Sequence, residues 1–103
     1  MQKSDLLEIS KALVTKERHE THGDARQNFA LVAEYWSAHL GLELDATDIA
    51  IMMTLFKLAR AKHNRSNLEN WVDGIGYLAC GGEIATEDPL SDQARRGVET
   101  AGN

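Results

Sequence analysis

The sequence predicts an all-α fold, a small four-helix arrangement with a flexible C-terminal tail. Apolar residues recur at steps of three and four along four segments, which is the period of an amphipathic helix. Only one of the 103 residues is proline, so the chain has few helix-breaking positions. No segment shows the alternation of apolar and polar residues that half-buried strands show. At this length we expect one core.

The first two predicted helices are separated by a glycine. Residues 4–20 have a loosely helical pattern of apolar residues, and Ser4 is a suitable N-cap. The second helix lies between Asp24 and Gly41, where Asp24 can cap the N-terminus and Gly41 is the glycine that often follows a helix. Gln27, three residues after Asp24, completes the pattern of a capping box.

The third predicted helix is capped by Asp45 or Thr47 and runs to about Lys62. It is apolar on most of its circumference, which is typical of a helix at the buried centre of a bundle. The fourth helix begins near Ser66 or Asn67 and continues towards two glycines at 81 and 82. We therefore expect a helical domain over residues 1–85 and a tail over residues 86–103, which contains few large apolar residues.

Composition narrows the classes of function. The formal net charge of −5 argues against nonspecific nucleic-acid binding, which needs a basic surface. No run approaches the roughly 18 uninterrupted apolar residues of a membrane span. The N-terminus lacks the apolar run of a secretory signal, and the single Cys80 cannot form an internal disulfide. These observations favour a cytoplasmic protein that does not associate with membranes.

The stretch HGDARQNF, residues 22–29, allows two interpretations. Asp24 can serve only as a helix cap. Alternatively, the free N–H groups of a helix N-terminus can bind an anion such as phosphate, with His22, Arg26 and Asn28 as further ligand-binding groups. A buried amide such as that of Asn28 would need hydrogen-bond partners.

A second group of candidates lies on the third helix. Thr54, Lys57 and Ala61 form a narrow stripe, which is either the exposed edge of the helix or the side from which Lys57 and Arg60 point into a polar pocket. The cluster of cations that ends this helix can complement the helix dipole or bind an anion.

Carboxylates for such a pocket lie on the fourth helix. Glu69 and Asp73 are four residues apart, so they share a helix face and can reach one cation. Two glycines, Gly74 and Gly76, each lower helix propensity by about 1 kcal/mol relative to alanine. They serve either close helix packing or a ligand.

Taken as a set, HGDARQNF, Trp36, FKLAR and NWVDGIGY resemble a family of small bacteriophage and prophage proteins. The resemblance covers about residues 17–80. It implies a phage protein that acts in the cytoplasm of a host bacterium, and it implies no particular activity.

The chain also resembles, more distantly, the MazG-like all-α nucleoside triphosphate pyrophosphohydrolases. Glu17 and Glu20 have the spacing of that family's first acidic motif, and in NWVD the aspartate matches the second motif while Asn70 replaces its glutamate. The resemblance implies a hydrolase that binds magnesium around a nucleotide. If the chain is such an enzyme, Mg²⁺ would be held by Asp73 together with Glu69 or Glu20, and Asp24 is a further candidate ligand.

In such an enzyme Asp73 and Lys57 would be the catalytic residues. Lys57 and Arg60 would neutralise charge on the phosphate oxygens, and Trp36 or Tyr77 would stack on a base. The alternative is a non-enzymatic phage protein that captures a nucleotide-like, phosphate-containing ligand or a host protein. Whether the chain is an enzyme stays open at this stage.

Two further expectations concern shape. The structured part is short, so a helix face left apolar in the monomer is predicted to be buried in a homodimer. Both functional hypotheses require Asp24, Asn28, Lys57 and Asp73 to converge on one cavity. A third possibility is a purely structural protein, in which these polar residues only cap helices and form surface pairs.

Overall fold

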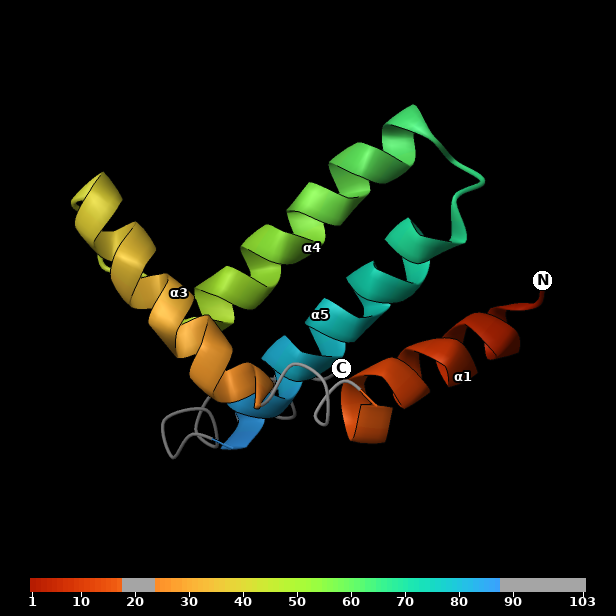
Figure 1. Cartoon of the computed structure of the whole chain (residues 1–103), viewed down its shortest axis with the longest axis horizontal. Helices are drawn as coiled ribbons and strands as arrows, with labels where there is room; N and C mark the ends of the chain where they lie inside the picture. Colours follow the sequence, from red (N-terminus) through yellow and green to blue (C-terminus); the bar gives the residue numbers. More distant parts are fainter. Residues whose placement is uncertain (18–23, 88–103) are drawn as a thin grey trace, which may run out of the picture.

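The described residues, 1–17 and 24–87 of the computed structural model, form four α-helices and contain no strand. This confirms the all-α, four-helix prediction (Figure 1). The helices are α1 (Lys3–Ala12), α3 (Ala25–Leu40), α4 (Ala46–His63) and α5 (Leu68–Glu87), and a π-helical segment, η1 (Leu13–Glu17), continues α1. The helix α5 continues to Glu87, so it includes the first two residues of the tail predicted at 86–103. The rest of that tail lies outside the described residues.

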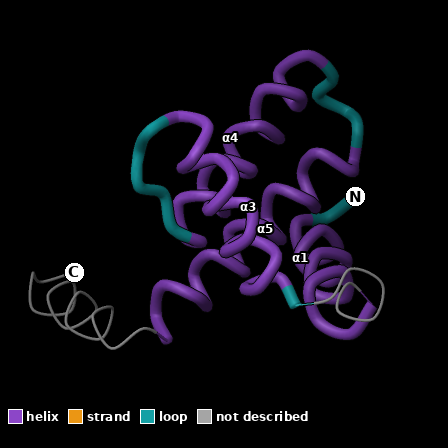
Figure 2. Tube along the Cα trace, turned by 60° about the vertical axis from the view of Figure 1, so that its left-hand side comes forward, coloured by secondary structure: helices purple, strands orange, loops and turns teal. Residues whose placement is uncertain are grey.

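The central element is α5. It packs antiparallel against α4, and α1 lies along its other side, where the Ser10 hydroxyl donates a 2.9 Å hydrogen bond to the Val72 carbonyl (Figure 1). In the turned view of Figure 2, α5 again lies between α4 and α1. The remaining helix, α3, crosses the end of the hairpin where α4 begins and α5 ends. The α4–α5 hairpin therefore carries the other helices.

The helix boundaries follow from their caps. Asp24 caps α3 and accepts a hydrogen bond of 3.1 Å from the Arg26 N–H, and Asp45 caps α4 and accepts one of 2.9 Å from the Asp48 N–H. Gly41 ends α3 with a φ of 70°, a left-handed conformation that favours glycine. These three predicted helix ends are confirmed.

The first helix differs from the prediction at its start. Its N-cap is Gln2 and not Ser4, because the Asp5 carboxylate accepts a 2.9 Å hydrogen bond from the Gln2 N–H and closes a helical turn earlier in the chain. After Ala12 the helix widens into the π-helical turn of η1. The predicted end of this helix, at residue 20, lies outside the described residues.

The glycines of α5 are packing positions, and the predicted helix end at Gly81 is wrong. A Cβ atom at Gly81 would lie 2.7 Å from the Ala50 Cβ, and one at Gly76 would lie 2.9 Å from Val14 Cγ1. Glycine lets α4 and η1 approach the α5 backbone closely, so packing outweighs the low helix propensity of these residues. The helix therefore continues to Glu87.

The core lies where α3 meets the hairpin. Its buried cluster consists of Phe29, Ala33, Ile49, Ala50 and Cys80. The prediction that the third helix is the buried centre of the bundle is wrong for the part of the chain that the structure describes, where α3 and α5 are the helices that pack substantially on α4. Four large apolar side chains of α4 are therefore about half exposed: Ile51, Leu55, Phe56 and Leu58.

Candidate functional site

A buried ion pair joins the two helices of the hairpin. The Nζ atom of Lys57 on α4 lies 2.9 Å from Oδ2 of Asp73 and 3.9 Å from Oε1 of Glu69, both on α5. The side chains of Lys57 and Asp73 are only 10% and 19% exposed, whereas that of Glu69 is 71% exposed. The Thr54–Lys57–Ala61 stripe is thus the face of α4 that packs on α5. The exposed-edge interpretation of this stripe is wrong.

The pairing has a simple physical reason. An ammonium buried without a partner is very costly, and Asp73 supplies both the opposite charge and a hydrogen-bond acceptor. A Cβ atom at Gly74 would lie 3.8 Å from the Lys57 Cβ, which is ordinary van der Waals contact, so the two helices lie side by side at this level. The pair therefore fixes how α4 and α5 align.

The predicted metal ligands are only partly brought together. Asp73 and Glu69 both face Lys57, as their shared helix face predicted. Within residues 1–17 and 24–87, no group of three or more acidic, histidine or cysteine side chains is arranged to hold a metal ion. Glu20 lies outside the described residues, as does His22. The magnesium site stays a prediction.

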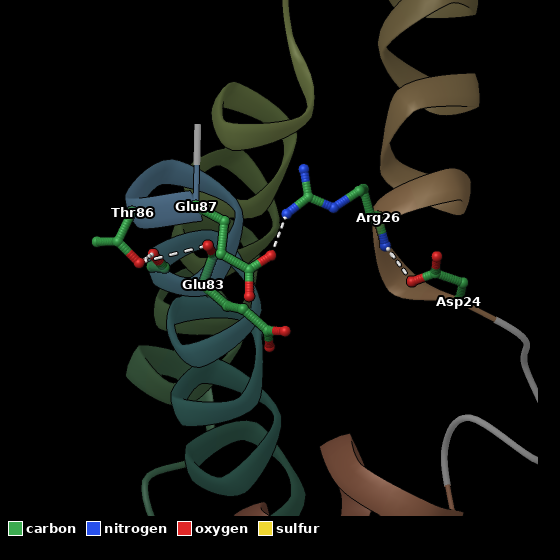
Figure 3. Close-up of polar contacts among 6 residues, drawn as sticks. Asp24, Arg26, Glu83, Thr86 and Glu87 are labelled. Carbon is green, nitrogen blue, oxygen red and sulfur yellow. Dashed lines mark hydrogen bonds and ion pairs between the residues drawn. The ribbon is translucent and has the colours of Figure 1, made fainter. Parts of the chain in front are cut away.

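The polar residues at the start of α3 lie elsewhere in the molecule. Arg26 Nη2 is 2.6 Å from Glu87 Oε2 at the end of α5, and Asp24 caps α3 beside it (Figure 3). At 1.5 Å per residue, Glu87 is about 21 Å further along α5 than Asp73. The predicted cavity shared by Asp24, Lys57 and Asp73 is therefore not formed. Asn28, one turn into α3, is exposed.

The two aromatic candidates contribute to packing. The Tyr77 ring lies 6.1 Å from the Phe29 ring, and Trp36 is partly buried against the same core. Tyr77 also lines, together with Asp73, a narrow gap between α5 and η1. Both aromatic residues thus have a structural role whether or not they contact a ligand.

A polar hollow lies at the other end of the hairpin, beyond the reach of α3. We call it the hairpin-end hollow; it measures about 460 Å³ and is lined by Phe56, Ala59, Arg60, His63, Asn64, Asn67 and Asn70. Arg60, predicted to point into a polar pocket with Lys57, lies here instead, with its guanidinium 5.6 Å from the centre of the Phe56 ring.

Asn70 is the most informative residue of this hollow. It is only 5% exposed, and no described residue hydrogen-bonds its side-chain amide. Buried amides nearly always have partners, because an unmade hydrogen bond costs about 1–3 kcal/mol. No side-chain nitrogen or oxygen atom of the described residues is fully buried without a partner, so the Asn70 amide keeps some contact with solvent and can bind either water or a molecule in the hollow.

The other asparagines present donors. The Asn67 side-chain oxygen accepts a 3.1 Å hydrogen bond from the Glu69 N–H, and that of Asn64 accepts one of 3.4 Å from the Ser66 hydroxyl. With their oxygens used by the loop, both side chains keep NH₂ donors for a ligand. In the MazG-like resemblance Asn70 replaces a carboxylate, and it is not among the ligand-binding residues predicted from the sequence. The three-residue spacing of Asn64, Asn67 and Asn70 was the available signal.

A larger hollow of about 770 Å³ between α3 and α4 has the opposite character. Its lining includes four carboxylates: Glu34, Glu43, Asp45 and Asp48. Such a surface repels anions, whereas the described residues that line the hairpin-end hollow include a guanidinium and no carboxylate. Of these two sites, the charges therefore favour the hairpin-end hollow for an anionic ligand.

The fold and the site together define a class of small all-α proteins with a buried lysine–aspartate pair and a polar hollow on one helical hairpin. The chain belongs to the family described as a domain of unknown function, DUF6378, which matches residues 5–85. No helix among the described residues is both long and apolar enough to cross a membrane.

The similar curated proteins come from bacteriophages, which confirms the predicted phage family. The chain is 32% identical to the Gene 55 protein of Mycobacterium phage D29 over 91 residues, covering 88% of the chain and 60% of that protein. It is 33% identical to the Gene 55 protein of Mycobacterium phage L5 over 73 residues, covering 70% of the chain and 47% of that protein. The chain thus spans only part of the length of these relatives. No solved structure matches.

Proposed function

We propose that the chain is a non-enzymatic phage protein that captures a phosphate-containing, nucleotide-like ligand in the hairpin-end hollow. The observation that carries this proposal is the Asn70 side chain, which is 5% exposed and has no hydrogen-bond partner among the described residues. A largely buried amide that lines a hollow and makes no hydrogen bond to a described residue is available to a ligand there.

The chemistry of the lining supports this ligand class. Arg60 offers a planar fork of N–H donors that matches a phosphate group. The amides of Asn64, Asn67 and Asn70 offer the paired donors and acceptors that recognise the edge of a base. Phe56 is half exposed and can stack on a planar ring.

Capture without hydrolysis is the better-supported mode of action. Hydrolysis of a phosphoanhydride by magnesium needs carboxylate oxygens close to the phosphates. The described lining of the hairpin-end hollow includes none, and the nearest candidates, Asp73 and Glu69, face Lys57. The MazG-like hydrolase remains a separate hypothesis, in which Glu20 would have to complete the magnesium site.

A thermal-shift screen with a parallel pyrophosphate assay tests the proposal. Purified protein is incubated with nucleoside mono-, di- and triphosphates, with and without Mg²⁺. A ligand at a hundred times its Kd adds about 2.7 kcal/mol of stability, which raises the Tm of a domain of this size by about 10 °C or more. We expect such a shift without release of pyrophosphate.

Two matched pairs of variants locate the site. Arg60→Gln is expected to abolish most of the shift, whereas Arg26→Gln, at the opposite end of the hairpin, is expected to leave it unchanged. Asn70→Leu is likewise expected to lose binding while keeping most of its own Tm, because it removes an amide that makes no hydrogen bond to a described residue. Asn28→Leu, at an exposed position of α3, is the control for the loss of an amide.

Three results would contradict the proposal. No shift with any phosphate compound would exclude capture of this ligand class. A shift lost in Arg26→Gln and kept in Arg60→Gln would move the site to the start of α3. Mg²⁺-dependent release of pyrophosphate that is lost in Asp73→Asn would establish the hydrolase instead.

A further inference from the structure

One side of the α4–α5 hairpin carries an uncovered apolar surface. We call it the hairpin face; it consists of Ile51, Leu55, Leu58, Trp71 and Leu78, each between 43% and 57% exposed. Within α4 its members follow one another at steps of four and three residues, and the two members from α5 are seven apart, so each set forms one helical stripe. Leu58 and Trp71 line the same shallow depression, which shows that the two stripes adjoin.

The hairpin face and the hairpin-end hollow lie on different sides of α4. Phe56, Arg60 and His63 form their own stripe towards the hairpin-end hollow. The helix α3 packs on the core side of α4, through Ile49 and its neighbours. Among the described residues, neither α3 nor α1 covers the hairpin face, because its five side chains keep about half of their surface exposed.

The surface that these side chains expose is apolar. The polar atom of Trp71, its indole Nε1, already donates a 2.7 Å hydrogen bond to the Arg65 carbonyl. The other four members of the hairpin face have aliphatic side chains. What covers this surface therefore has to be apolar itself.

We propose that a second copy of this chain covers the hairpin face, so that two α4–α5 hairpins pack into a four-helix bundle. Five half-exposed side chains at roughly 100 Å² each present about 500 Å² per protomer, which is at the upper end for a patch on a monomer. Pairing two such faces buries about 1,000 Å² before the rim is counted, the lower bound for a specific interface.

The spacing of the face fits a two-fold axis. The contacts between Ala50 and Gly81 and between Lys57 and Gly74 set the height at which α4 and α5 lie side by side. At that alignment the midpoint of Ile51 and Leu58 lies within about 3 Å of the height of the midpoint of the two α5 members. Consider a two-fold axis at this height that lies in the plane between the two copies and runs perpendicular to the helices. It places Ile51 over Leu58 of the second copy and Leu55 close to its own counterpart.

Charge favours this axis over one parallel to the helices. The last turn of α4 carries Arg60, Lys62 and His63, whereas Asp45 and Asp48 lie at its start. Of these residues Lys62 borders the hairpin face, and the other four line hollows elsewhere on α4, so they act on the second copy through the longer-range field of the helix ends. A perpendicular axis runs the two α4 helices antiparallel, so the cationic end of each lies over the acidic end of the other. An axis parallel to the helices would put like charges at the same end of the dimer, which is unfavourable.

Light scattering coupled to size-exclusion chromatography tests the dimer. We expect the wild-type chain to elute as a dimer at micromolar concentration and Leu55→Glu, which sets two carboxylates against each other at the axis, as a folded monomer. Leu31→Glu is the matched control, because Leu31 on α3 is also about half exposed and lies outside the hairpin face. Far-UV circular dichroism verifies that both variants keep their helices.

Disulfide trapping gives a second readout that needs no disruption of the fold. In a Cys80→Ala background, Leu55→Cys is expected to form a covalent dimer on treatment with oxidised glutathione, and Leu31→Cys is expected to stay monomeric. A wild-type monomer would overturn the proposal. A dimer that survives Leu55→Glu and is not trapped through Leu55→Cys would overturn it as well, since the second copy would then lie elsewhere.

This test is independent of the proposed ligand. The hairpin-end hollow lies on another side of α4, so the dimer leaves it open. Loss of the dimer in Leu55→Glu is therefore expected to leave the thermal shift with nucleotides in place.

Discussion

The buried pair of Lys57 and Asp73 gives the sharpest prediction about stability. Replacing Lys57 by methionine keeps the volume of the stem and removes the ammonium that lies 2.9 Å from the Asp73 carboxylate. The carboxylate, only 19% exposed, then remains buried without its partner. Breaking a buried pair in this way costs about 3–5 kcal/mol. Because Asp73 keeps some contact with solvent, we expect a loss of about 3 kcal/mol.

Urea denaturation followed by circular dichroism, at one fixed protein concentration, measures this loss of unfolding free energy. In a thermal melt of the same variant, a loss of 3 kcal/mol lowers the Tm of a domain of this size by about 12–24 °C. The double variant Lys57→Met with Asp73→Leu replaces both charges by apolar groups and is expected to be more stable than Lys57→Met alone. The coupling energy between the two positions should be about 2 kcal/mol or more.

The exposed pair of Arg26 and Glu87 is the matched control. Its two side chains are 45% and 56% exposed, so substituting either by glutamine should change stability by no more than about 1 kcal/mol. If Lys57→Met and Asp73→Leu each cost as little as these control variants, and if their effects simply add, the pair is not buried as described and the argument for how α4 and α5 align fails.

Three further predictions concern helix packing and helix ends. Gly81→Ala should be about 1–3 kcal/mol less stable than Gly82→Ala in urea, because a Cβ at Gly81 would lie 2.7 Å from Ala50 whereas nothing lies within 4 Å of one at Gly82; equal stabilities would contradict the close packing. Gly41→Ala should cost about 1 kcal/mol, measured as a drop in Tm, because its φ of 70° disfavours residues with a side chain; an unchanged Tm would argue against this helix end. Ser10→Ala should lose about 1 kcal/mol, since the buried hydroxyl donates to a carbonyl of α5, and faster amide exchange in α1 would be the accompanying signal.

Local signals in the sequence were enough to predict the helices and most of their ends. Asp24, Gly41 and Asp45 act through their own backbone neighbours, so their roles can be recognised from a few adjacent residues. The stripe pattern also placed Lys57 and Asp73 on helix faces that turned out to meet. These features depend on spacing within one helix.

Features that depend on the partner helix could not be predicted in the same way. Gly81 looked like a helix end because its packing against Ala50 involves a residue 31 positions earlier in the chain. The apolar pattern of α4 is typical of a central helix. The sequence does not show whether an apolar side chain is covered by the same chain or by a second copy. Asp24 and Asn28 were expected to meet Lys57, although Arg26, beside them, pairs with Glu87 at the end of α5 and Lys57 pairs with Asp73 nearer its start.

The candidate site was predicted only in part for a related reason. Carboxylates and cations indicate candidate sites directly from the sequence. An asparagine indicates one only when its burial and its hydrogen bonds are known. Asn70 is such a residue. Of the predicted ligand-binding residues, only Arg60 lies in the hairpin-end hollow.

The proposed site depends most on the Asn70 amide, which we expect to hydrogen-bond a bound ligand. The most direct test is a titration of ¹⁵N-labelled protein with a nucleotide, following the side-chain NH₂ resonances in two-dimensional NMR spectra. We predict that the Asn70 NH₂ signals shift and become protected from solvent exchange as the ligand saturates its site, while those of Asn28 do not move. Saturable binding that leaves the Asn70 signals in place would contradict it, and so would the absence of any change across the panel of phosphate compounds.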